Sequence, residues 1–302
     1  MKNKKSVQNK LLPKGVHLID QDLRTLSEGE LGSFFASKRS GRIMLAPLIK
    51  SVIWQALSKI REGTEPPIEG NIRTFWYRWL KPVLTRLRQN EPTATDPYEL
   101  MLRAFSELVM EENAFKYADF DFTDENWENR RIGNIHPQIL VFSEKRGWVR
   151  FLRTIHDKFG VSTLALGGAP SALTSEYTST HIKDALKTKD VSISLIGVVD
   201  YDPAGDMIAE AFKGQLEACG LEVRNMKTVI EPKHYSAEEL KIYKYPLPIW
   251  QQTKNENWLK KTGGIDGKEF GLEAESLNRE KLNKLVEGLI TKAIKKAKPF
   301  LK

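Results

Sequence analysis

The chain has very little cysteine and histidine. Its 302 residues include one cysteine, Cys219, and five histidines. A single cysteine excludes an internal disulfide bond and a thiolate zinc site. The histidines are scattered without metal-ligand spacing, so the sequence offers no histidine-based metal site either.

Long apolar runs are also missing. No apolar stretch approaches the roughly 18–20 residues that a membrane-spanning helix needs. The basic start of the chain is not followed by the apolar segment of a secretory signal. The composition, 40% hydrophobic and 28% charged, is typical of a globular protein. We therefore expect a cytoplasmic protein without a membrane partner.

Charge is plentiful but unevenly distributed. The net charge is +8 and the pI about 9.3. Residues 1–90 hold 17 lysines and arginines against 7 acidic residues, whereas residues 91–135 hold 4 against 11. A basic first part indicates a polyanionic partner such as nucleic acid. A solvated basic surface is the alternative.

The first part of the chain is predicted to be helical. Apolar spacing favours helices over 42–60, 72–88 and 97–113, and a loop rich in glycine and proline joins the first two. Because the second helix is basic and aromatic, the pair resembles a helix-turn-helix or winged-helix DNA-binding unit. We expect an N-terminal extension (1–35), a winged-helix-like domain (36–113) and an acidic linker (114–138).

From residue 139 the pattern alternates between strand and helix. Strands are predicted at 139–143, 161–166, 192–199 and 221–228, with helices at 147–159, 174–186 and 204–218 between them. This order is typical of a parallel sheet in an α/β fold. A second domain of this class should cover 139–302, with a C-terminal helix near 278–298.

The most informative segment is the third of these strands and the turn that follows it. An apolar run ends in Asp200-Tyr201-Asp202-Pro203-Ala204-Gly205, so both carboxylates lie at the carboxyl end of a strand, where open α/β sheets place their sites. Glu144 follows the first strand of the same domain. Burying three like charges together is very costly without a cation, and hard oxygen ligands suit Mg²⁺. Glu144, Asp200 and Asp202 are therefore predicted metal ligands.

Other interpretations of this segment remain open. Asp206 is either a fourth ligand or a helix N-terminal charge favoured by the helix dipole. The D-x-D pattern also occurs in haloacid-dehalogenase-type phosphatases and in glycosyltransferases. The phosphatase pattern prefers threonine or valine where this chain has Pro203. A pair of exposed turn aspartates is the remaining alternative.

The combination of motifs resembles a Toprim domain. The strand ending in Glu144-Lys145, a glycine turn and the D-x-D-P-x-G form are most similar to the A subunit of topoisomerase VI and its relative, the meiotic double-strand-break protein. The segments 168–174 and 270–277 resemble two further segments of that family. Glu273 and Glu275, in the second of these, are expected to be surface residues rather than ligands.

The same family carries an upstream signature in which a tyrosine follows an arginine by four residues. Arg73-Thr74-Phe75-Trp76-Tyr77 is similar to it, with Thr74 in place of the usual aspartate. The resemblance implies that Tyr77 attacks a DNA phosphodiester and becomes joined to the 5′ end, with Mg²⁺ assistance. Arg73 would stabilise the developing charge on the phosphate or activate the tyrosine.

The resemblance also implies partners. These are double-stranded DNA, a second copy of the chain that completes each active site, and a separate ATPase B-type subunit. The chain itself has no G-x-x-x-x-G-K-[ST] phosphate loop. A nucleoid-associated protein is expected. The predicted contacts to the DNA backbone are Arg78, Lys81, Arg86 and Arg88, which are otherwise an ordinary solvated helix face. Lys145 is a further predicted contact to the backbone.

Two competing functions remain. One is a Toprim nuclease of the defence type that cuts DNA by metal-activated water, with Tyr77 uninvolved. The other is a DNA-binding module without catalytic activity. Without the resemblance, Tyr77 would be interpreted as a core aromatic among Phe75, Trp76 and Trp79.

Overall fold

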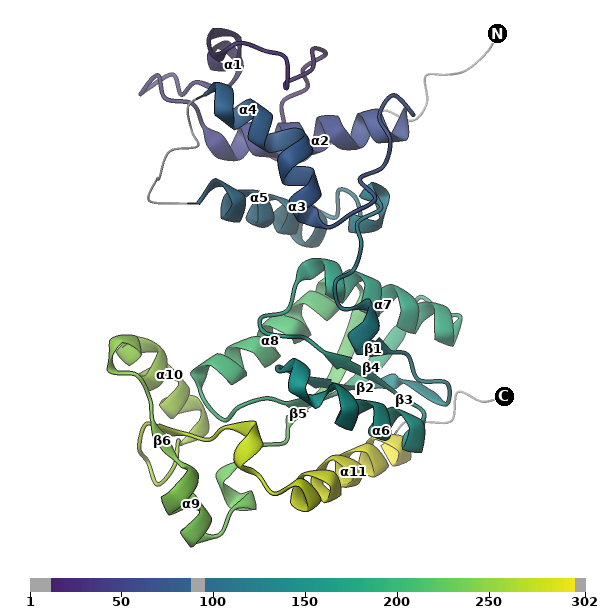
Figure 1. Ribbon diagram of the computed structural model, residues 1–302, viewed down its shortest axis with the longest axis vertical. Helices are drawn as coiled ribbons and strands as arrows, with labels where there is room; N and C mark the ends of the chain where they lie inside the picture. The colour runs from purple at the N-terminus through teal and green to yellow at the C-terminus, as the bar shows by residue number, and fades with distance from the viewer. Residues whose placement is uncertain (1–11, 88–95, 297–302) are drawn as a thin grey trace. The chain divides into compact units, whose positions relative to one another are not determined.

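The computed structural model describes residues 12–87 and 96–296, and the chain divides into two compact units between Asp124 and Glu125. Figure 1 shows the elements of each unit. The division falls inside the segment 114–138, which was expected to be a linker. Residues before it fold into the first unit and residues after it into the second, so within the described chain this segment is structured on both sides of the boundary.

The described part of the first unit is helical. Its α-helices are α1 (Glu28–Phe35), α2 (Leu45–Arg61), α3 (Ile72–Phe75), α4 (Lys81–Arg86) and α5 (Pro97–Ser106). These confirm the predicted helices to within a few residues. Backbone pairing in this part is limited to isolated bridges, Ala36 with Ile43 and Gly70 with Phe122. A β-hairpin wing is therefore not seen in the described part of this unit.

Residues 12–35 belong to the core of the first unit and are not a detached extension. Leu23, Leu31 and Phe35 are fully buried. Ser27 and Glu30 form a capping box, in which each side chain accepts a hydrogen bond from the backbone of the other. This reciprocal cap satisfies free N–H groups and starts α1, where the sequence was expected to be irregular.

Aromatic packing draws the start of the expected linker into this core. The Phe75 ring lies 5.0 Å from that of Phe105 and 5.7 Å from that of Phe120, both edge to face. Phe122 stacks on Phe120 at 5.3 Å. All four rings are buried, and such pairs stabilise beyond the area they bury. The expected linker 114–138 is acidic on average, but its Phe120 and Phe122 are core residues of the first unit.

A π turn, Trp76–Leu80, joins α3 to α4. The N–H of Lys81 donates to the carbonyl of Trp76, five residues earlier. Pro82 follows directly, and proline has no N–H and clashes with the carbonyl four residues before it. The wider turn accommodates that clash, and π turns are frequent at functional sites.

The second unit is built on a mainly parallel sheet, confirming the α/β class. Its strands are β1 (Arg130–Arg131), β2 (His136–Ser143), β3 (Val161–Ala165), β4 (Val191–Val198) and β5 (Leu221–Thr228). Their spatial order is β1-β3-β2-β4-β5, and the short edge strand β1 alone runs antiparallel to its neighbour. The four parallel strands match the four predicted ones.

Helices cover both faces of this sheet, as Figure 1 shows. They are α6 (Val149–Phe159), α7 (Ala172–Leu186), α8 (Pro203–Ala218) and α11 (Arg279–Lys296). Alternate side chains of β2 point to opposite faces: Ile139 and Val141 pack with α6 and α11, whereas Leu140 and Phe142 pack with α7 and α8. Because both faces are covered, the strand is continuously apolar.

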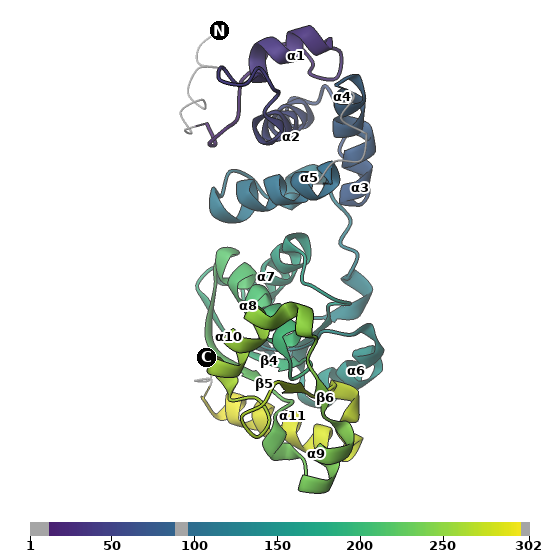
Figure 2. The same cartoon turned by 90° about the vertical axis from the view of Figure 1, so that its left-hand side faces the viewer.

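A smaller set of elements between β5 and α11 was not predicted. It comprises α9 (Ala237–Tyr243), β6 (Tyr245–Pro246), α10 (Gln252–Thr262) and β7 (Phe270–Gly271). β6 pairs with β7 in a two-stranded antiparallel sheet, which lies between α9 and α10 in both views (Figures 1 and 2). A bridge between Tyr201 and Leu272 ties this subsheet to the end of β4.

Among residues 12–87 and 96–296, no helix combines the length and apolar character required to cross a membrane.

Gly205 provides a test of how closely α8 approaches the sheet. A Cβ atom at this position would lie 2.2 Å from the carbonyl oxygen of Asp200. We expect Gly205→Ala to lower the free energy of unfolding by about 1–3 kcal/mol, the usual cost of overpacking. Gly214→Ala in the same helix is the matched control, because nothing lies within 4 Å of its added methyl. Alanine there should stabilise by about 0.5–1 kcal/mol, and denaturant titration of both variants would show whether the signs differ.

Candidate metal centre

Two of the three predicted carboxylates, Glu144 and Asp200, are neighbours because β2 and β4 are adjacent in the sheet. Ser143 is in register with Val198 at the ends of these parallel strands. The N–H of Glu144 donates to the carbonyl of Val198 at 3.3 Å. Parallel strands end at the same edge, so Glu144 and Asp200 leave the sheet side by side, as the sequence predicted.

Glu144 differs from Asp200 and Asp202 in the hydrogen bonding of its carboxylate. Its Oε2 atom is buried and has no hydrogen-bond partner. Burial raises the pKa of the Glu144 carboxyl, and the charge of Asp200 raises it further. Its main chain is fixed, because the carbonyl oxygen accepts from the N–H groups of Gly167 and Gly168 at 2.8 and 2.9 Å. The carboxylate is therefore held in place with an unsatisfied oxygen.

Asp200 is held by one backbone and one side-chain donor. Its Oδ1 accepts from the N–H of Ala274 at 2.8 Å, and its Oδ2 lies 3.0 Å from the Nζ of Lys145. Burial raises the pKa of Asp200, and the bonds from Ala274 and Lys145 oppose that rise. The segment that carries Ala274 is thus fastened to the strand end.

Asp202 caps α8 and is held by a tyrosine that the sequence did not indicate. Its Oδ1 accepts from the N–H of Gly205 at 2.7 Å, and its Oδ2 accepts from the hydroxyl of Tyr245 at 2.7 Å. Burial and the neighbouring Asp202 carboxylate raise the pKa of Tyr245 well above its usual range. The phenol therefore stays protonated and acts as a donor.

Asp206 takes no part in this group. Both of its carboxylate oxygens accept from the Nζ of Lys261, at 2.7 and 2.9 Å. The same ammonium bonds Glu210, one turn further along α8. Of the two interpretations of Asp206, the geometry favours the helix-terminal charge over the fourth ligand.

Lys145 joins Asp200 to two glutamates from the far end of the chain. Its Nζ bonds the carboxylates of Glu273 and Glu275, the latter at 2.8 Å. Oxygens of Asp200, Glu273 and Glu275 lie within 4.8 Å of one another, close enough to hold a metal ion. Both glutamates are exposed, as expected of surface residues, and they also belong to this carboxylate group. Their place in the acidic segment 270–277 was the signal that pointed to them.

The donor set suits a hard cation. All the acidic groups here offer carboxylate oxygens, the ligands that Mg²⁺ prefers. An ionised carboxylate has more acceptor positions than the bonds described above occupy. The unpartnered Oε2 of Glu144 is the observation that a bound cation explains best, because an unpaired buried charge is costly. Of the predicted ligands, Asp200 belongs to the described group whose oxygens lie within 4.8 Å of one another, together with Glu273 and Glu275. Glu144 and Asp202 are not part of that group and remain predicted ligands at the same strand ends.

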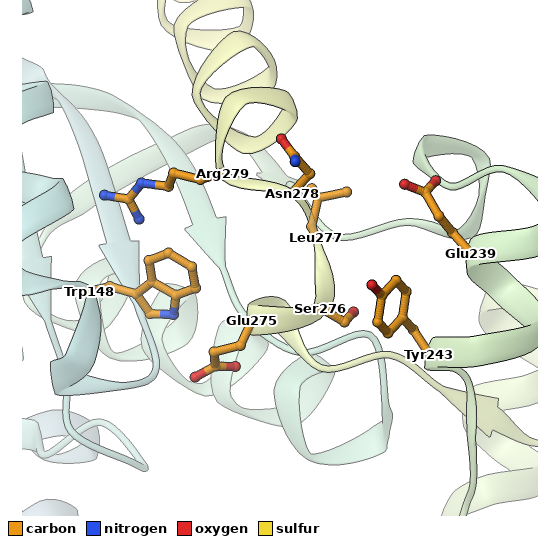
Figure 3. Close-up of a pocket in the computed structure, with 8 residues that line it drawn as sticks. All are labelled: Trp148, Glu239, Tyr243, Glu275, Ser276, Leu277, Asn278 and Arg279. Atoms are coloured by element: carbon orange, nitrogen blue, oxygen red, sulfur yellow. The ribbon is translucent and has the colours of Figure 1, made fainter.

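A pocket of about 450 Å³ borders the acidic group. Glu275 lines it and also bonds Lys145. Figure 3 shows Trp148 and Arg279 on one side of this residue and Tyr243 on the other. The guanidinium of Arg279 lies 5.2 Å from the centre of the Trp148 ring. The carboxylates therefore lie next to a hollow with both aromatic and charged walls.

Tyr77, in the first unit, is not a core residue. It is 57% exposed, whereas Phe75 and Trp79 on either side are fully buried. The ammonium of Lys81 lies 4.8 Å from the centre of the Tyr77 ring. The alternative interpretation of Tyr77 as a core aromatic is wrong, and its side chain is accessible beside a cation.

The other basic residues of this helix differ in availability. The guanidinium of Arg73 lies 5.5 Å from the centre of the Tyr98 ring, so the cation on the Tyr77 ring is Lys81. Arg78 forms an ion pair with Glu65 at 2.8 Å, so its charge is already partnered within the unit.

Arg86 and Arg88 are the remaining predicted DNA contacts of this segment. Arg86 is exposed, as is Lys81. Arg88 lies outside the described residues.

The buried Oε2 of Glu144, which has no hydrogen-bond partner, gives a prediction that needs no DNA. A carboxyl whose pKa is raised from 4.5 in the folded state destabilises the protein as the pH rises past its unfolded value. We therefore expect Glu144→Gln in EDTA to lose less stability than the wild type between pH 4.5 and neutrality. The variant should also lose the rise in melting temperature that Mg²⁺ gives the wild type.

Asp206→Asn is the control for Glu144→Gln, because Asp206 is engaged by Lys261. It should retain the stabilisation by Mg²⁺. Equal Mg²⁺ responses in the wild type and Glu144→Gln would remove Glu144 from the ligand set.

No family model matches this chain. No curated protein matches it either. Functional assignment therefore rests on the geometry above and on the motifs in the sequence.

Proposed function

We propose that the protein is a Mg²⁺-dependent DNA-cleaving transesterase, similar in its parts to the A subunit of a type IIB topoisomerase. The observation that carries the proposal is the buried, unpartnered oxygen of Glu144 beside Asp200 at the end of two parallel strands. In this proposal the first unit is a winged-helix-like DNA-binding domain and the second a Toprim-type domain.

The carboxylates support the metal-dependent half of this chemistry. A Mg²⁺ ion held by Glu144, Asp200 and Asp202 would supply charge stabilisation for a phosphodiester and for its leaving oxygen. Tyr245 and the N–H of Gly205 orient Asp202, and the N–H of Ala274 orients Asp200. The ligands are therefore pre-positioned, which lowers the cost of assembling the site.

Tyr77 is the nucleophile of the proposed reaction. Its phenolic oxygen attacks the phosphorus, the bond from phosphorus to the 3′ oxygen breaks, and the 5′ phosphate stays on the tyrosine. The phenolic proton leaves to solvent and the 3′ oxygen takes a proton in return. The exposure of Tyr77 and the nearby Lys81 ammonium support this role, because a protonated tyrosine needs activation by positive charge or a base.

The partners follow from the proposal. The substrate is double-stranded DNA, and Arg73, Lys81 and Arg86 are exposed cations in the described helical segment that carries Tyr77. Two copies of the chain would be needed to cut both strands. Strand passage would further require a separate ATPase subunit.

Hydrolysis by a metal-activated water is the second candidate function. The observation in its favour is that the whole carboxylate group lies in the second unit, so a hydrolytic site needs nothing from Tyr77. Transesterification is preferred because it gives a role to Tyr77, an exposed tyrosine with the Lys81 ammonium beside its ring.

The experiment is to incubate the protein with supercoiled plasmid and Mg²⁺ and to quench with detergent. We expect DNA fragments that carry protein on their 5′ ends until protease treatment. Tyr77→Phe should abolish these adducts, because it removes the attacking hydroxyl and little else from an exposed side chain.

Tyr177→Phe is the matched control, since Tyr177 is also partly exposed but lies on α7 in the second unit, outside the carboxylate group and its pocket. It should cleave as the wild type does. Free ends together with an active Tyr77→Phe would replace transesterification by hydrolysis. Intact plasmid with all three proteins would reject cleavage by the chain alone.

A further inference from the structure

Lys145 occupies an unusual position for a residue next to a metal ligand. Its ammonium bonds Asp200, Glu273 and Glu275, and these are the three residues whose oxygens cluster within 4.8 Å. One positive charge therefore stands where a divalent cation would have to balance the same carboxylates.

The placement of Lys145 is built into the backbone. Lys145 follows Glu144 directly at the end of β2, and its carbonyl oxygen accepts from the hydroxyl of Ser143 at 3.0 Å and from the N–H of Trp148 at 3.3 Å. Burial alone would lower the pKa of Lys145, but its bonds to the three carboxylates raise it well above the usual range. The side chain thus remains a cation.

Asp200 belongs to two groups of carboxylates. It faces Glu144, whose pKa it raises, and it also bonds Lys145 together with the two glutamates. A cation bound between Glu144 and Asp200 would repel the ammonium 3.0 Å from Oδ2. The Lys145 ammonium and a divalent cation would therefore compete for the Oδ2 of Asp200.

We propose that Lys145 is an internal counter-ion that neutralises Asp200 in the metal-free protein and gives up Asp200 when a divalent cation binds. The inference rests on the proposed metal centre. The displaced ammonium stays bonded to Glu273 and Glu275, because both already accept hydrogen bonds from it. Lys145 is accordingly a positioning residue that sets the affinity for the metal.

This exchange has a consequence for the substrate. An ammonium released from Asp200 lies beside the ion that would hold the phosphate. It keeps its bonds to Glu273 and Glu275 but loses the third carboxylate partner, which leaves one of its three N–H donors for a phosphate oxygen. Metal binding would in this way convert an internally paired lysine into a phosphate-binding one.

The test is calorimetric titration of Mn²⁺ and Mg²⁺ into the wild type, Lys145→Met and Lys145→Arg, without DNA. Lys145→Met keeps the length of the side chain and removes the charge. We expect it to bind the metal about fivefold more tightly, the factor for loss of one partly exposed ion pair that competes with the metal. Lys145→Arg keeps the charge and should remain near the wild-type affinity.

Melting temperatures in EDTA and in Mg²⁺ give a second measurement. Lys145→Met should melt lower than the wild type in EDTA, because the carboxylates lose their counter-ion, and should show a larger Mg²⁺-induced rise. A purely structural role would lower both temperatures equally.

The outcomes separate this inference from the metal centre itself. Equal or weaker metal binding by Lys145→Met, with wild-type binding intact, would overturn the counter-ion role and leave the metal centre standing. Binding by Lys145→Met alone would support it strongly. No binding by any of the proteins would reject both.

Discussion

Mutual repulsion among carboxylates at one edge of the sheet is the constraint on which the second unit depends. The adjacency of β2 and β4 forces Glu144 and Asp200 together, and burial in that position is unfavourable for both. The surrounding donors are drawn from distant parts of the chain. Tyr245 bonds Asp202 across 43 residues, and the N–H of Ala274 bonds Asp200 across 74. These bonds fasten the β6–β7 subsheet and the segment before α11 to the sheet edge. The local fold is therefore organised around the carboxylates of Asp200 and Asp202.

The sheet was predictable from two patterns. The central strands β2 and β4 carry apolar runs that are buried on both faces, whereas the edge strand β5 begins with an alternation of buried apolar and exposed polar residues. The four parallel strands lie within a few residues of their expected positions. The position of Asp200 and Asp202 at a strand end followed from the apolar run of β4. The two-residue strand β1 left no comparable signal, because Arg130 and Arg131 show neither an apolar run nor an alternation.

The parts that sequence reasoning missed depend on contacts between distant residues. Nothing local to Glu273 indicates that Lys145 bonds it across 128 positions. Arg73 precedes Tyr77 by one turn, yet its guanidinium lies over Tyr98 of another helix. The acidic composition of residues 114–138 led to the expectation of a linker. Average charge does not reveal that Phe120 and Phe122 pack in an aromatic core. Pairings of this kind are set by packing rather than by spacing.

Tyr77 lies in the first unit and the carboxylates in the second. Tyr77 is therefore the residue that distinguishes the proposed transesterification from hydrolysis. Transesterification and hydrolysis need the same cation on the same carboxylates, so changes at Glu144, Asp200 or Lys145 affect both. Only the attacking oxygen differs. A hydrolytic site gains nothing from a tyrosine that is 57% exposed in the other unit, and exposing an aromatic ring forgoes the burial that its two neighbours obtain. In the proposed transesterification, Tyr77 with Lys81 over its ring supplies the attacking oxygen, whereas in hydrolysis a water molecule does so.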